Sequence, residues 1–193
     1  MRRPQTYDDI EELEATARTP AEHRSAAQTL TAWAEVAAPD DEVPPAALLS
    51  AAAWHLDQGG DPEAALALHR RAAAAAGDVP PDARVYLHGA LMAAGAHDEA
   101  RRLADEVRRS APADVAVYEF MAANYESGGD LAQAHRWLNL GAARLERPDD
   151  EVPIGADHDA FLLLTARRRV RQALGFPLDD LDVLVPEPIP FDR

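Results

Sequence analysis

A pattern of small residues returns three times in this chain of 193 residues and limits what it can fold into. In each copy a glycine is followed five residues later by an alanine. The alanines Ala65, Ala100 and Ala134 are therefore 35 and then 34 residues apart. Glycine commonly ends a helix, and a small residue in the next helix lets two backbones approach to about 8–10 Å. The period predicts an array of helical hairpins.

The third copy, residues 118–145, shows such a hairpin most fully. Apolar residues recur at helical spacing, and Gly128 and Gly129 then end the first helix. Asp130 opens a second helix, with Gln133 in the capping-box position. The side of this second helix that would meet the first carries Ala134, Leu138 and Gly141.

This period resembles that of the tetratricopeptide repeat (TPR) family, and the three copies cover residues 46–145, about half of the chain. His69, His88 and Val107 depart from the family's residue types. The family positions are filled by Leu49, Ala52, Ala53, Leu56, Ala65 and Ala72, then by Leu87, Leu91, Ala100 and Pro112, and finally by Tyr118, Met121, Ala122, Tyr125, Ala134, Leu138 and Gly141.

The resemblance implies an all-α fold, an α-α superhelix (TPR-like solenoid) of antiparallel hairpins. Much of the 47% apolar fraction is alanine, which suits thin helical stacks better than a globular core. We expect this repeat domain over residues 1–175 and an extended, acidic and apolar, Pro-rich tail at 176–193. Within the domain we expect a degenerate N-terminal hairpin at 7–38, repeats at 46–77, 81–112 and 115–147, and a capping helix at 157–174.

The degenerate hairpin has strong helix signals but an unusual residue at one position. Thr19 and Glu22 form a capping box, and Pro20 suits the first helical position. His23 stands where the repeats have their alanine. Terminal repeats are commonly atypical, because one of their faces meets water.

The net charge of −15 argues against nucleic acid and membranes as partners and favours a partner with a basic face, although the same charge also serves solubility. Cysteine is absent, which excludes disulfides, thiolate nucleophiles and Cys-based zinc sites. The N-terminus lacks the apolar run of a signal peptide, and no stretch reaches the ~20 apolar residues of a membrane span. We therefore expect a soluble, cytoplasmic protein.

The tail contains four prolines, which favour an extended chain, and many apolar residues, which need cover. It either folds back on the repeats or docks on a neighbouring subunit, and covalent linkage favours the first. Arg167, Arg168, Arg169 and Arg171 of the capping helix should form its solvated side; a phosphate or acidic-peptide site there is the less favoured reading. This closing segment is also similar to those of bacterial TPR-region proteins that carry a cysteine-based zinc motif, which is absent here.

No arrangement of residues predicts catalysis. The seven histidines lack metal-ligand spacing, no serine lies in a GxSxG context, and the glycine pairs lack the Gly-Lys-Ser of a phosphate loop. We expect no enzyme, no cofactor and no metal.

In TPR proteins the first helices of the repeats line a concave groove, and this implies a site for a partner. The chain has no Lys, Arg or Asn at these positions, so the carboxylate clamp of chaperone-binding relatives is not expected. Trp54 could anchor a partner or simply cover the neighbouring hairpin. The expected groove residues are Ser50, Trp54, Asp57, Gln58, Asp82, Val85, Met92, Glu119, Ala123 and Glu126.

The favoured function is therefore a non-catalytic protein–protein interaction module, an adaptor or regulator. It would bind a basic or amphipathic peptide or helix in the groove. One alternative is a self-assembling scaffold joined through the tail or the solenoid ends, so that monomer and homodimer both stay open. The least favoured alternative is an unrecognised helical enzyme.

Overall fold

The computed structural model describes residues 6–38, 41–145 and 158–185. Within these ranges the regular structure is helical and no strand is present, which confirms the all-α prediction. The chain divides into two compact units, Met1–Leu103 and Ala104–Arg193, and each is described by itself.

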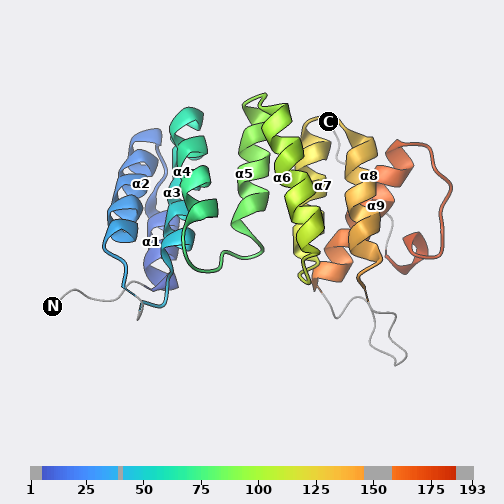
Figure 1. Ribbon diagram of the computed structural model, residues 1–193, viewed down its shortest axis with the longest axis horizontal. Helices are drawn as coiled ribbons and strands as arrows, with labels where there is room; N and C mark the ends of the chain where they lie inside the picture. The colour runs from blue at the N-terminus through green and yellow to red at the C-terminus, as the bar shows by residue number, and fades with distance from the viewer. Residues whose placement is uncertain (1–5, 39–40, 146–157, 186–193) are drawn as a thin grey trace. The chain divides into compact units, whose positions relative to one another are not determined.

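The helices follow the predicted order along the chain (Figure 1). The first unit contains α1 (Tyr7–Thr16), α2 (Pro20–Glu35), α3 (Pro45–Gln58), α4 (Pro62–Ala74), α5 (Ala83–Ala93) and the start of α6 (His97–Ser110). The second contains the rest of α6, α7 (Ala116–Ser127), α8 (Leu131–Ala142), α9 (His158–Ala173) and the 3-10 helix η2 (Asp182–Leu184).

The helix starts use the caps that the sequence indicates. The Thr19 hydroxyl accepts a hydrogen bond from the Glu22 amide at 3.3 Å, and the Glu22 carboxylate accepts one from the Thr19 amide at 2.8 Å. The carboxylates of Asp61 and Asp130 accept from the amides of Ala64 and Gln133 in the same way, at 3.1 and 3.0 Å. Each cap satisfies backbone donors that the first turn of a helix leaves unpaired.

The turn between paired helices has one geometry in all three hairpins. Gly60, Gly95 and Gly129 have φ values of +76°, +71° and +78°, a left-handed conformation that favours glycine. The amide after each glycine donates to a carbonyl five residues earlier at 2.9 Å, as in the bond from Asp130 to Tyr125. Both features belong to the Schellman motif, so the helix reverses at an equivalent point in each hairpin.

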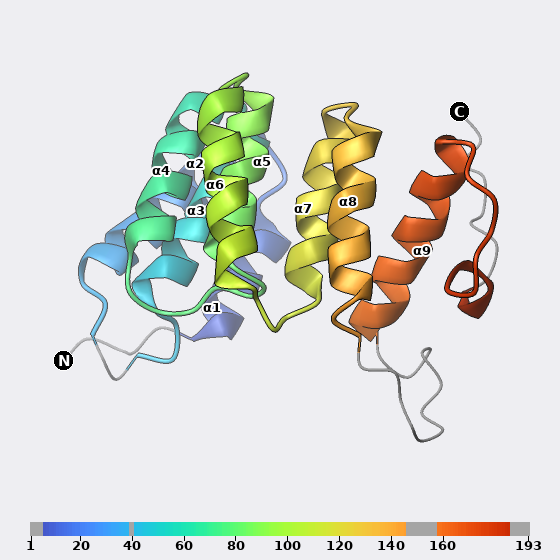
Figure 2. The same cartoon turned by 45° about the vertical axis from the view of Figure 1, so that its right-hand side comes forward.

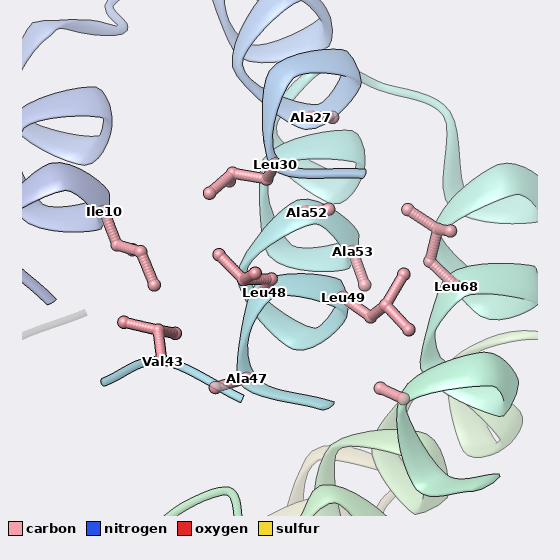
Figure 3. Close-up of a cluster of buried hydrophobic side chains, with 11 residues drawn as sticks. Ile10, Ala27, Leu30, Val43, Ala47, Leu48, Leu49, Ala52, Ala53 and Leu68 are labelled. Carbon is pink, nitrogen blue, oxygen red and sulfur yellow. The ribbon is translucent and has the colours of Figure 1, made fainter. Parts of the chain in front are cut away.

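The alanine five residues after each of these glycines is fully buried. Ala65, Ala100 and Ala134 each have 0% of their surface exposed, as the sequence predicts for residues at a close helix contact. In the first unit, α2, α3 and α4 pack side by side around leucines and further alanines (Figure 3). This core is built from Ile10, Ala27, Leu30, Val43, Ala47, Leu48, Leu49, Ala52, Ala53, Leu68 and Ala72.

The second unit brings α9 against both helices of the α7–α8 hairpin (Figure 2). Gly141 of α8 lies at the tightest point. A Cβ atom there would lie 2.8 Å from the Tyr118 Cβ and 2.3 Å from a Leu163 methyl group. Leu163 is fully buried, so it has little space to move. The glycine therefore permits α7, α8 and α9 to meet.

We expect Gly141→Ala to destabilise the second unit by about 1–3 kcal/mol, because overpacking outweighs the better helix propensity of alanine. Urea denaturation followed by circular dichroism measures this change. Adding Leu163→Ala removes one of the two close contacts, so the double variant should lose less than the sum of the single losses. A Gly141→Ala protein as stable as the original would contradict the close approach.

Candidate functional site

Four of the predicted groove residues lie along one side of α3. Trp54, Asp57 and Gln58 are exposed and Ser50 is half-buried, and their spacing places them on successive turns. Trp54 keeps 42% of its surface exposed, although tryptophan is usually well covered. This side of α3 therefore carries an exposed aromatic ring beside polar side chains.

The predicted positions on and before α5 are less accessible. Val85 is 1% exposed and belongs to the interior, so its assignment to an open groove is wrong. The reason is that α5 packs against both α3 and α4. Met92 is half-buried against Leu87 and Leu91. Asp82 caps α5 by accepting from the Arg84 amide at 2.8 Å.

The predicted residues of the second unit, Glu119, Ala123 and Glu126, are all half-buried, and α9 packs against their helix. The Glu126 carboxylate accepts two hydrogen bonds from the Arg169 guanidinium, at 3.1 and 2.7 Å. Burial raises the pKa of Glu119, and the nearby Arg169 partly offsets that rise. Ala123 lies between the two carboxylates in sequence. These positions of α7 therefore already face a cation that belongs to the chain.

Two of the four predicted groove carboxylates, Asp82 and Glu126, pair with the chain's own arginines. Besides Glu126 with Arg169, Asp82 pairs with the guanidinium of Arg84, and the Asp57 carboxylate lies 3.5 Å from His69 Nε2. The sequence could not reveal the Glu126 pair, because its two residues are 43 positions apart. Trp54 therefore distinguishes this surface better than its charge does.

The inner edge of Trp54 packs against two histidines. His23 Nδ1 and His55 Nδ1 are 2.8 Å apart, so one ring donates a hydrogen bond to the other. The Trp54 ring meets His23 edge-on at 5.6 Å and His55 at 4.8 Å between centroids. His55 is fully buried. Trp54 thus packs on one side and is exposed on the other. His23 stands where the repeats have an alanine, and its ring forms a hydrogen bond with His55 of α3.

The segment after α9 folds back along that helix, as the sequence favours, and Figure 2 shows it beside α9. Arg167 binds both oxygens of Asp179, at 2.9 and 2.7 Å, and one oxygen of Asp182 at 2.8 Å. Arg171 binds the other oxygen of Asp182 at 2.8 Å. We call the residues Pro177–Val185 the clasp segment. The rest of the predicted tail, 186–193, lies outside the described residues.

Arg167 does not have the solvated role predicted for it. It is only 5% exposed, and Asp182 is 1% exposed. Arg167 also donates from Nε to the side-chain oxygen Oδ1 of Asn139 on α8 at 2.7 Å, and the side-chain nitrogen Nδ2 of Asn139 lies 3.0 Å from His135 Nε2. The prediction failed because four arginines within five residues do not reveal which one turns toward a neighbouring helix.

No family model, no curated protein and no solved structure matches this chain. Within the described ranges, His, Asp and Glu side chains form no group of three with the geometry of a metal site. Every helix in those ranges is too short or too polar to span a bilayer.

Two buried histidines make the stability of the first unit depend on pH. Burial lowers the pKa of His55 to about 4, with a further contribution from His23, and burial lowers that of His88 to about 4. In the unfolded chain both would titrate near 6.5. The stability held by the neutral rings is therefore complete above pH 6.5 and is lost as the pH falls toward 4.

We expect each histidine to cost up to about 2 kcal/mol of stability between about pH 7 and pH 5. Urea denaturation across this range measures the loss. His88→Leu should reduce the pH dependence of the unfolding free energy, because leucine cannot bind a proton when the chain unfolds. An equal pH dependence in the two proteins would contradict the assignment to His88.

Proposed function

We propose that the protein is a non-catalytic interaction module that holds a peptide or helix against the exposed side of α3. The residues assigned to this contact are Ser50, Trp54, Asp57 and Gln58, and the hairpins are proposed to form a TPR-like superhelix. The equal turns at Gly60, Gly95 and Gly129 and the buried alanine after each support this architecture.

The exposed Trp54 is the observation that carries the proposal. Tryptophan is enriched among the residues that dominate binding energy at interfaces. Its inner edge is fixed by His23 and His55, so its orientation is set before a partner binds and less conformational entropy is lost. Asp57, one turn along, is exposed and can meet a basic group of the partner. The partner is thus an apolar or aromatic anchor flanked by Arg or Lys.

One observation favours the alternative of self-assembly. Phe176, Leu178, Val183 and Leu184 are 43–66% exposed on and beside the clasp segment. An ordered segment with four such side chains resembles an interface more than a linker. The high negative charge opposes association of two copies, however, so this function is second. Sedimentation at increasing protein concentration separates the two, because an interaction module stays monomeric without its partner.

We expect Trp54→Ala to weaken binding of a selected peptide about thirtyfold or more, as for an interface hot spot. The peptide would come from a displayed library selected on the wild-type protein and be measured by fluorescence anisotropy. Phe120→Ala is the matched control, because Phe120 is an exposed aromatic residue of α7, at 37%, that the proposal does not use. Selected peptides that bind the Trp54→Ala protein as well as wild type would contradict the proposed site.

A further inference from the structure

The end of α9 repeats the turn that ends the first helix of each hairpin. Gly175 has φ +75°, and the Phe176 amide donates to the Arg171 carbonyl five residues earlier at 3.0 Å. In the three hairpins a second helix follows this turn and packs through a buried alanine. After Gly175 the clasp segment follows instead. The chain has replaced an apolar helix contact by a polar one.

The contacts of the clasp segment are those of a recognised peptide. Together, three arginines of α9 donate hydrogen bonds to three backbone carbonyls and to the two carboxylates of the clasp segment. Arg168 binds the carbonyls of Asp182 and Val185 at 3.1 and 2.6 Å, and Arg171 binds that of Pro177 at 2.6 Å. Bidentate pairing of arginine with carboxylate adds geometric specificity as well as energy. The clasp segment is therefore held through two carboxylates three residues apart and through three backbone carbonyls.

The receiving side of this contact is built by α8 and α9. Asn139 of α8 orients the Arg167 guanidinium, and His135 lies in hydrogen-bonding distance of Asn139. The clasp segment buries Val185, which is 3% exposed, but leaves Leu178, Val183 and Leu184 at least half exposed, so few of its apolar side chains help to hold it. The clasp segment is held through hydrogen bonds and ion pairs with the arginines of α9, and a peptide that carries the same groups can compete for them.

We propose that Arg167, Arg168 and Arg171 form a binding site for an acidic peptide segment with two carboxylates three residues apart, and that the clasp segment occupies this site until such a partner displaces it. The partner is a protein segment of the pattern D-x-x-D, as in Asp179 and Asp182. The site lies on α9 and shares no residue with the contact proposed for Trp54 on α3. Its failure in the test below would leave the function proposed for Trp54 untouched.

The test uses a fluorescent peptide with the sequence of residues 176–185 and two full-length proteins. One is the wild type, and the other carries Asp179→Asn and Asp182→Asn, which weaken its own clasp. We expect the variant to bind the peptide at least about ten times more tightly than wild type, because its own segment no longer competes. A peptide with Asp179→Asn should bind the variant at least about ten times more weakly.

Asp180 provides the matched control, since it is exposed and a peptide with Asp180→Asn undergoes the same change of charge. This control peptide should bind like the original. Equal affinities of the Asp179→Asn and Asp180→Asn peptides would overturn the proposal, because attraction would then depend on charge alone. Failure of the folded variant to bind the original peptide would overturn it as well.

If the double variant does not fold, a protein whose clasp segment keeps both aspartates tests the proposal instead. The chain has no cysteine, so Val183→Cys gives a single labelling position on an exposed residue of the clasp segment. A linked segment has an effective concentration in the millimolar range. Free peptide at about ten times that concentration should displace the labelled clasp segment and lower the anisotropy of the label. Unchanged anisotropy under these conditions would overturn the proposal.

Discussion

The close pairing of each first helix with the helix that follows it is the contact on which this structure depends. A left-handed glycine reverses the chain, and a fully buried alanine five residues later lets the backbones meet. Larger side chains at the alanine would separate the helices, and a residue with a Cβ at the glycine would strain the turn. Because both residues recur with the repeat, the same hairpin forms three times. The exposed faces, including that of Trp54, are what these contacts leave uncovered.

The arginines of this acidic chain are used largely within it. Arg169 neutralises Glu126, and Arg167 and Arg171 hold Asp179 and Asp182. The hydrogen bonds from Arg167 are the main cause that keeps the pKa of Asp179 well below its usual range. A net charge of −15 therefore does not mean that carboxylates are free at every predicted site. What distinguishes α3 is an oriented aromatic ring, and what distinguishes α9 is a cluster of guanidinium groups.

The sequence predicts contacts that repeat or that are local. The caps at Thr19 and Asp130, the turns at Gly60 and Gly129, and the buried Ala134 all follow from short patterns with known backbone chemistry. Contacts between distant side chains do not, because they depend on how far each helix is rotated about its axis. This is why Val85 was placed at a surface and Arg167 in solvent. His23 was marked as unusual by its position, yet only the structure brings it to His55.

The most direct measurement of the account's central claim compares two valine substitutions on one helix. Ala134→Val places two extra methyl groups at the buried helix contact, whereas Ala132→Val places them on the exposed side of α8. Both lose the same helix propensity, so their difference in urea denaturation reports the contact alone. Ala134→Val should be less stable than Ala132→Val by about 1–3 kcal/mol. Equal stability of the two proteins would contradict the close pairing of α7 and α8 through Ala134.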